Sequence, residues 1–269
     1  MSEDPPTPTP ARRPGELSFA ARRRLFLIGA AGLGALMLWG LGGLPDFEDF
    51  TPLYGQVMNQ VAVEERSTTA VVTAVNFDYR GFDTLGEEFI LFAAVLVLAL
   101  LLRRLREERP ERLEGDPRHR HTTSAAVRLT CVALVGPTVL LSIYITMHGH
   151  LTPGGGFQGG VIAATALLLV YLGSDYATMQ RLRPVALVET AKAAGAGAFV
   201  LIGLAGLIVA GAFLENFLPL GTPGELVSAG TIPLLSLAVG IEVAGGFVLL
   251  LSDFLDQLLV IRRKRGTEA

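Results

Sequence analysis

Acidic residues inside apolar stretches are the first candidates for chemistry in this chain. Glu242 stands in the middle of the apolar run from Ala238 to Gly246. A carboxyl group at the centre of a membrane helix costs a few kcal/mol to insert, and such groups usually face a bundle interior or a wet cavity. Glu242 is therefore either a proton-relay or cation-binding carboxylate, or a hydrogen-bonded carboxyl that docks a neighbouring subunit.

Two further acids, Glu87 and Glu88, open another apolar run. Thr84-Leu-Gly-Glu87 has the form of a helix capping box, and the helix dipole favours acids at that end. Capping thus gives Glu87 a structural explanation, and the alternative is a role in an ion path. Glu88 adds a second acid one residue on, so both remain candidates.

Histidine and lysine residues supply the other titratable groups near apolar runs. His148 and His150 could exchange protons near neutral pH, or serve only in interfacial hydrogen bonding. Glu189 and Lys192 are three residues apart, so they form either a salt bridge on one helix face or a charged step in an ion pathway. We expect no metal site, no cofactor and no catalytic residue.

A glycine-rich segment, His148–Gly160, separates two long apolar runs. Glycine allows backbones to approach closely where membrane helices meet. The segment lacks the Gly-Lys-Ser/Thr ending of a phosphate-binding loop. Thr152 followed by Pro153 predicts a helix N-cap and a proline at the first helical position. The glycines to which we assign a structural role are Gly154, Gly155, Gly156, Gly159 and Gly160.

Composition identifies the elements that hold these residues as membrane helices. The chain has 269 residues, of which 51% are hydrophobic and 17% charged, below the roughly 25% charged residues of a soluble domain. One cysteine excludes an internal disulfide and a multi-cysteine metal site. Spans of about 20 apolar residues must be helical, because their backbone groups have no water to bind. Six stretches qualify: 25–44, 85–102, 126–147, 156–173, 193–213 and 232–252.

The fold class is therefore an all-α polytopic membrane protein with six transmembrane helices. Pro137 predicts a kink in the third span, and Pro233 marks the start of the sixth. All of the 22 lysine and arginine residues except Arg66 and Arg80 lie on one side of this topology. The positive-inside rule then places both termini in the cytoplasm. Because topology explains the arginines, we expect no nucleic-acid partner.

The polar stretch 103–123 divides the chain into two modules. In the outer segment, 45–83, the spacing of Phe47, Phe50, Leu53, Tyr54 and Val57 predicts a short interfacial helix. The β-branched run 69–77 predicts an extended strand. The predicted organisation is a disordered basic tail (1–24), a two-helix module (25–102), a cytoplasmic linker (103–123), a four-helix module (124–261) and a basic tail (262–269).

Two segments resemble known families. Val71-Val-Thr-Ala-Val-Asn-Phe-Asp-Tyr-Arg-Gly-Phe-Asp-Thr-Leu-Gly-Glu87 resembles the C-terminal region of the large A-type subunit of Mrp/Mnh-type multisubunit Na⁺/H⁺ antiporters. The same MbhE-like module occurs as a small membrane subunit of membrane-bound hydrogenases. His148–Gly160 and the helices around it resemble the MnhB domain, the B-type component of those antiporters. The direct fusion of the two modules is a departure from the antiporter pattern.

The resemblance implies a membrane subunit of a monovalent cation (Na⁺)/proton antiporter, contributing structure and a candidate part of the ion path. The partners would be the other subunits, the lipid bilayer, protons and Na⁺, in a bacterial or archaeal cell membrane. The alternative is a membrane subunit of an ion-translocating respiratory-type or hydrogenase complex, with redox chemistry on partner chains. A stand-alone transporter is disfavoured, because the spans hold few polar groups.

Overall fold

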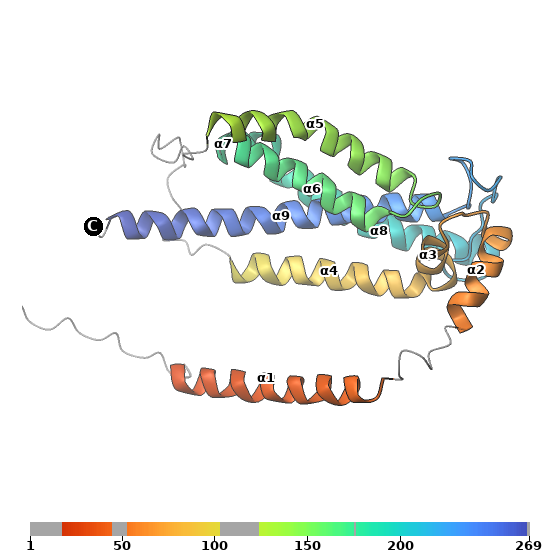
Figure 1. Ribbon diagram of the computed structural model, residues 1–269, viewed down its shortest axis with the longest axis horizontal. Helices are drawn as coiled ribbons and strands as arrows, with labels where there is room; N and C mark the ends of the chain where they lie inside the picture. The colour runs from red at the N-terminus through yellow and green to blue at the C-terminus, as the bar shows by residue number, and fades with distance from the viewer. Residues whose placement is uncertain (1–17, 45–52, 103–123, 175, 268–269) are drawn as a thin grey trace, which may run out of the picture. The chain divides into compact units, whose positions relative to one another are not determined.

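The computed structural model describes residues 18–44, 53–102, 124–174 and 176–267, and these form helices joined by turns and loops (Figure 1). Within these ranges no β-strand is present, and one isolated bridge joins Gly221 to Ser228. The helices are α1 (Phe19–Gly42), α2 (Leu53–Arg66), α3 (Val71–Ala74), the π-helix η1 (Val75–Tyr79), α4 (Gly81–Leu101), α5 (Ala125–Met147), α6 (Gly156–Gly173), α7 (Tyr176–Leu182), α8 (Val185–Ala210) and α9 (Ile232–Thr267).

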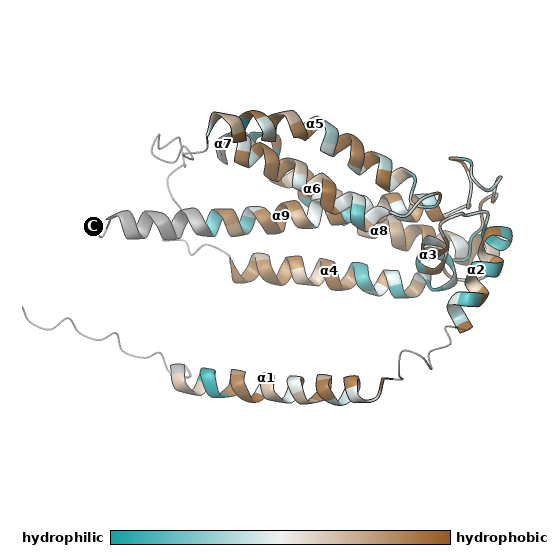
Figure 2. Ribbon diagram, viewed as in Figure 1, coloured by the Kyte–Doolittle hydropathy of each residue, from teal (hydrophilic) through white to brown (hydrophobic). Residues whose placement is uncertain are grey.

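Six of the described helices are long and apolar enough to cross a membrane, as the sequence predicted. They are α1, α4, α5, α6, α8 and α9, and brown, hydrophobic residues are frequent along their ribbons (Figure 2). The fifth span begins at Val185, well before the predicted Ala193, because the helix continues through the charged residues that interrupt its apolar pattern. It ends before the predicted Phe213, since Gly211 adopts a left-handed conformation (φ 88°) that terminates the helix.

The chain contacts divide it into two compact units, residues 1–53 and 54–269. In the first unit, α1 is capped by Ser18, whose hydroxyl accepts a hydrogen bond from the Ala21 amide at 3.1 Å. The apolar side chains of α1 are exposed, including Phe26 and Trp39. An exposed apolar helix of this length is suited to a lipid environment.

Helix α9 is the centre of the second unit. It contacts α4, α5, α6 and α8, and more of its span is buried than that of any other candidate span in the described residues. Ile232, Leu235, Val239 and Val243 of α9 are fully buried in the main apolar core, together with Phe199 of α8. The other spanning helices of this unit therefore take their positions from α9.

Glycines bring the helix backbones close to α9, as predicted for the glycine-rich segment. A Cβ on Gly156 would lie 2.1 Å from the Ser236 carbonyl oxygen, and one on Gly160 would lie 2.7 Å from the Val243 Cβ. Gly159 packs in the same way against Thr146 of α5. In the turn before α6, Gly154 and Gly155 have φ values of 156° and 133°, which L side chains rarely adopt.

Several local predictions were wrong. The run 69–77 contains α3 and part of η1 instead of a strand, because its small and apolar side chains are buried against the bundle. The Thr84–Glu87 capping box does not form: α4 begins at Gly81, and the Thr84 hydroxyl donates to the Asn76 carbonyl at 2.5 Å. Thr152 and Pro153 likewise precede α6, whose N-cap is Gly155.

Other local predictions can be compared directly with the helices. The expected interfacial helix is present as α2, although Phe47 and Phe50 lie outside the described residues. Pro233 is the second residue of α9, and Pro137 lies inside α5. Helix α7 was not predicted, because its seven residues are mixed polar and apolar.

The close approach of α6 to α9 leads to a stability prediction. Gly156→Ala places a methyl group against backbone atoms of α9, so it should destabilise the fold by about 1–3 kcal/mol, the usual range for overpacking. The matched control is Gly197→Ala in α8, where an added Cβ meets nothing within 4 Å. Thermal unfolding in detergent should show a lower midpoint for Gly156→Ala alone. Equal midpoints for both variants would contradict the packing.

Candidate functional site

Three charged side chains from three helices are buried in the middle of the second unit. They belong to Glu88 of α4, Lys192 of α8 and Glu242 of α9, which are 2%, 8% and 0% exposed. Glu242 is ten residues into α9, or about 15 Å along the helix, half the thickness of a hydrocarbon core. The three residues thus form a polar cluster at membrane depth.

Small residues allow the three helices to meet at this cluster. A Cβ on Gly195 of α8 would lie 2.6 Å from the Glu242 amide nitrogen, and one on Gly245 of α9 would lie 3.0 Å from the Lys192 Cβ. On the other side, Leu91 and Val95 of α4 pack against Gly246. Lys192 and Glu242 are thus themselves in contact with glycines, and Glu88 lies about one helical turn before Leu91.

The two carboxyl groups interact with each other, and the lysine interacts with Glu242. Glu88 and Glu242 are mutual electrostatic partners, and Lys192 is the neighbouring positive charge. The Lys192 Nζ lies 4.2 Å from the centroid of the Phe92 ring, a cation–π contact. None of the four carboxylate oxygens of Glu88 and Glu242 makes a hydrogen bond of good geometry within the described chain.

This arrangement is suited to holding and transferring a proton. Two like charges this close are unfavourable in a buried site, whereas one proton shared between the carboxyls leaves a single negative charge opposite one ammonium group. Apart from each other, the two carboxyls have no hydrogen-bond partner in the described residues, and burying such groups is costly, so their presence favours a function over a purely structural role. The cluster combines three of the candidates that the sequence singled out, Glu88, Lys192 and Glu242.

The other candidates lie elsewhere. Glu189 and Glu87 are exposed, and among the described residues neither forms an ion pair, so the expected Glu189–Lys192 salt bridge is absent. Instead, Lys192 turns inward to Phe92 and Glu242. His148 stacks on Tyr144 with 4.2 Å between ring centroids, and its Nδ1 lies 3.0 Å from the Tyr144 carbonyl oxygen.

Backbone carbonyls of the α5–α6 turn join this turn to the segment around α3. The hydroxyl of Thr68 donates to the His150 carbonyl at 2.5 Å, and that of Thr73 donates to the Gly149 carbonyl at 2.5 Å. The Thr69 hydroxyl donates to the Leu151 carbonyl at 2.6 Å. The sequence did not reveal this connection, because threonines are also frequent in strands and no pattern marks their acceptors.

A second connection was also missed. Arg66 Nε lies 2.7 Å from an Asp78 carboxylate oxygen, and Asn216 donates to the same carboxylate at 3.0 Å. Burial raises the pKa of Asp78, while the hydrogen bond from Asn216 and the Arg66 charge oppose that rise. Arg66 was one of only two basic residues on its side of the predicted topology. An arginine that the positive-inside rule does not explain indicates a specific acidic partner, which for Arg66 is Asp78.

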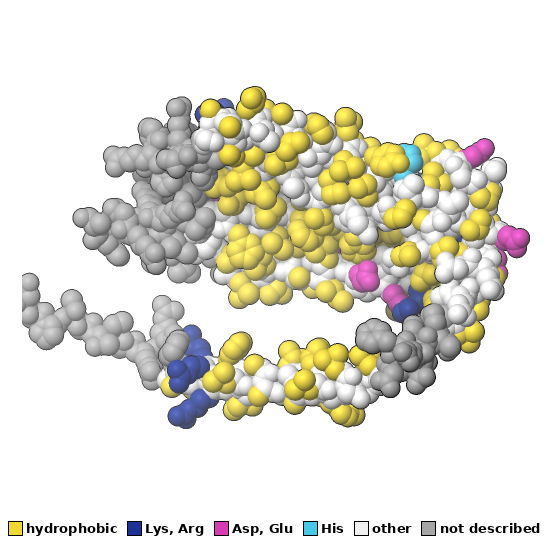
Figure 3. Space-filling view, in the orientation of Figure 1, with side chains coloured by type: hydrophobic (Ala, Val, Ile, Leu, Met, Phe, Trp, Pro, Cys, Tyr) yellow, Lys and Arg dark blue, Asp and Glu magenta, His cyan; other side chains and the backbone are white. Residues whose placement is uncertain are grey.

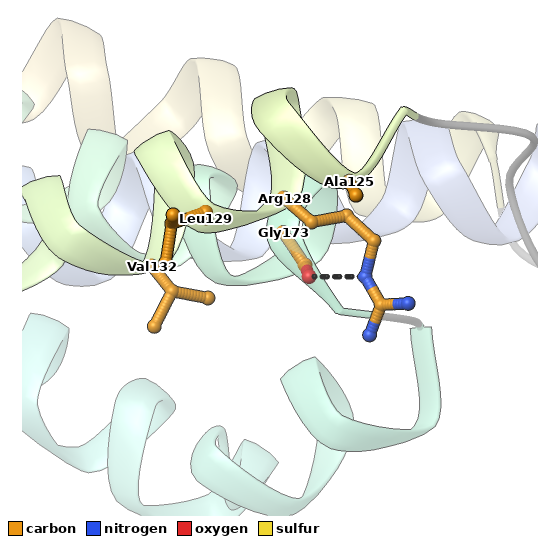
Figure 4. A pocket seen from close by; sticks show the side chains of 5 residues that line it. All are labelled: Ala125, Arg128, Leu129, Val132 and Gly173. Atoms are coloured by element: carbon orange, nitrogen blue, oxygen red, sulfur yellow. Dashed lines mark hydrogen bonds between the residues drawn. The ribbon is translucent and has the colours of Figure 1, made fainter.

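An open groove in the described part of the chain lies away from this cluster. It has a volume of about 300 Å³ and is lined by apolar side chains of α5 and by Arg128, whose Nε donates to the Gly173 carbonyl at 3.3 Å (Figure 4). A guanidinium at the C-terminal end of α6 stabilises the helix by satisfying a free carbonyl. The groove contains no acid, so the buried cluster remains the candidate site. No group of three or more metal-binding side chains occurs among the residues described.

Comparison with known proteins relates part of this chain to a known family. Residues 126–249 match the model of a domain related to the MnhB subunit of Na⁺/H⁺ antiporters. An uncharacterised protein of Methanocaldococcus jannaschii is 31% identical over 217 residues, which cover 70% of this chain and 78% of that protein. Residues 126–249 are therefore a domain of the MnhB type.

Two solved structures are similar to nearly the whole chain. A chain of the membrane-bound sulfane sulfur reductase, an archaeal respiratory membrane complex, has 31% identity and a TM-score of 0.64, with 87% of this chain and 98% of that chain covered. The Mrp complex of Dietzia sp. DQ12-45-1b has 26% identity and a TM-score of 0.63, with 88% and 26% covered. Together with the six candidate spans, these findings support a multi-pass membrane protein of the kind found in multisubunit membrane complexes, and the MnhB match favours the Na⁺/H⁺ antiporter type.

In the MnhB domain, His150 is the most buried titratable group outside the spans. The residue is 1% exposed, and neither ring nitrogen makes a hydrogen bond of good geometry in the described chain. Burial lowers the pKa of His150, whereas the nearby backbone of Glu225 and Leu226 opposes this change. The ring is therefore held in its neutral form beneath the loop before α9.

This burial predicts a pH-dependent stability. Because the folded pKa lies below the ordinary value of 6.5, the unfolded chain binds more protons just below that pH. The stability that comes from burying neutral His150 is present above pH 6.5 and is lost as the pH falls through the pKa of His150 in the folded protein. Unfolding midpoints measured from neutral to acidic pH should fall less for His150→Gln than for the wild type. Gly197→Ala, which leaves every titratable group in place, is the control and should fall as the wild type does; identical pH profiles for all three proteins would contradict the prediction.

Proposed function

We propose that Glu88, Lys192 and Glu242 form a proton-exchanging part of the ion path in a multisubunit monovalent cation/proton antiporter, with this chain as its B-type subunit. The observation that carries the proposal is the buried pair of carboxyl groups beside a lysine within the membrane-spanning part of the bundle. Membrane helices rarely hold such groups without a role in proton or ion movement.

The mechanism needs only a shift of one proton within the cluster. When the shared proton leaves, the two carboxylates repel each other and attract Lys192 away from the Phe92 face. When a proton returns, Lys192 can resume the cation–π contact. The position of the Lys192 side chain thereby depends on whether the carboxyl pair holds a proton. No covalent intermediate forms. The chain itself acts in transport, and any redox chemistry belongs to partner chains.

The topology proposed from the sequence agrees with this role. Both termini lie in the cytoplasm in this proposal, because the basic residues gather at the corresponding ends of the spans. Residues 25–102 constitute the MbhE-like module and residues 124–261 the MnhB module, joined by the linker 103–123. Glu88 comes from the first module, whereas Lys192 and Glu242 come from the second, so the fusion keeps the three groups in one chain.

A subunit of an ion-translocating respiratory-type complex is a second candidate. The observation that favours it is the similarity to 98% of a chain in an archaeal respiratory membrane complex. The same buried cluster would serve there, since ion movement would be driven by redox partners instead of by a second ion gradient. The two functions therefore differ in the partners and share the site.

Purification of the tagged chain in mild detergent should distinguish the two. For the antiporter, we expect antiporter-like subunits by mass spectrometry and no iron–sulfur proteins. Recovery of iron–sulfur or hydrogenase-like subunits would support the second candidate and overturn the first. An unrelated six-span protein is the control for non-specific recovery.

The cluster itself is tested by ion-coupled transport. Glu242→Ala and Glu88→Gln should each lower cation-driven proton movement by about tenfold or more, because loss of a positioned proton carrier typically has effects of that size or larger. Glu189→Ala is the control, since Glu189 is exposed on α8. The measurement is the collapse of a pH gradient in vesicles that contain the whole complex.

Assembly must be measured alongside transport. A Glu242→Ala complex that assembles normally and transports at the wild-type rate would rule out the relay. A Lys192→Met variant adds a second test, because it removes the charge while keeping an unbranched apolar stem. It should also lose activity, and normal transport would show that the lysine only fills space.

A further inference from the structure

Helix α4 has two sides of different character. Thr84, Glu88 and Val95 are buried, and the helix contacts α8 and α9 through this side. Away from it runs a line of six residues with spacings of four and three, the pattern of a coiled-coil seam. We call this line the α4 seam, and it consists of Asp83, Glu87, Ile90, Ala94, Val97 and Leu101.

One acidic residue of this seam, Glu87, lies within the membrane core. Arg103 and Arg104 follow α4 and mark the interface at one end. Counting back about 20 residues, the number that spans about 30 Å, reaches the position of Asp83. Glu87 is therefore about 6 Å inside the hydrocarbon. A tilted helix needs more residues to cross, which would place Glu87 deeper still.

Glu87 has no counter-charge in the described part of the chain. Asp83, one turn earlier, forms an ion pair with Arg80, whereas Glu87 forms no ion pair and neighbours only the like charge of Glu88. An acidic side chain lies among hydrophobic ones over α4 in the space-filling view (Figure 3). Ionisable residues at this depth rarely face lipid, because exposure to hydrocarbon costs several kcal/mol.

We propose that the α4 seam is the docking surface for a membrane helix of another subunit, which presents a basic or hydrogen-bond-donating side chain to Glu87. Small side chains make close packing possible: Ala94 is at the centre of the seam, and a Cβ on the adjacent Gly86 meets nothing within 4 Å. Ile90, Val97 and Leu101 supply the apolar contact.

This inference rests on the chain acting within a multisubunit complex, and it is independent of the proposed ion path. A Glu242→Gln complex should still assemble through the seam even where transport is lost. Failure of docking and failure of the relay are therefore measured separately.

Photo-crosslinking in membranes that contain the whole complex tests the surface. A photoreactive residue at Ala94 should give adducts with one partner subunit. Mass spectrometry should place them within a helical turn of a lysine, arginine, histidine or amide side chain. The matched control is Leu96, which is 49% exposed on the other open side of the same helix. Adducts at Ala94 only with lipid or with a second copy of this chain, or the same partner adducts from both positions, would overturn the proposal.

A charge test completes the experiment. Glu87→Lys should lower co-purification of the cross-linked subunit about tenfold, because like charges across the interface are repulsive. Glu87→Gln should retain it, since the amide oxygen still accepts a hydrogen bond. Both variants are compared at equal amounts of inserted chain, which separates docking from folding. Wild-type recovery with Glu87→Lys would show that no basic or donor group faces Glu87.

Discussion

Close contact between helix backbones around α9 is the constraint on which this structure depends. Without a hydrophobic driving force between membrane helices, packing and polar contacts must hold them together. Gly156 and Gly160 bring α6 against α9, and Gly195 does the same for α8. Because Gly195 lies directly against Glu242, the contact that assembles the bundle also seals its buried acid from lipid.

The candidate site follows from that assembly. Glu88, Lys192 and Glu242 would each be an isolated charge on a single helix, and each becomes tolerable only when α4, α8 and α9 meet. Buried pairs of this kind contribute little net stability and depend strongly on geometry. Their arrangement therefore argues for a role in handling charge, and it explains why the residues are contributed by both modules of the chain.

The sequence predicted the spans well, because their lengths and apolar composition are set by the bilayer. It also named all three residues of the cluster, since an acid or a lysine inside an apolar helix is conspicuous. The sequence did not predict that these three residues lie together. Helical spacing paired Lys192 with Glu189, whereas in the structure Lys192 contacts Phe92 and interacts with Glu242. Helix–helix contacts have no counterpart in the local spacing of residues. The β-branched run 69–77 was misread for the same reason, because its helical form depends on tertiary burial.

The hydrogen bonds between the α5–α6 turn and the segment before α4 depend on side chains on one side only. Three threonine hydroxyls on one side meet three backbone carbonyls on the other, those of residues 149–151. Because every residue has a backbone carbonyl, the side chains of Leu151 and of the buried His150 take no part in these hydrogen bonds. The hydroxyls of Thr68, Thr69 and Thr73 have no such substitutes. For these hydrogen bonds alone, substitutions should therefore be tolerated better at residues 149–151, which supply carbonyls, than at the three threonines, which supply hydroxyls.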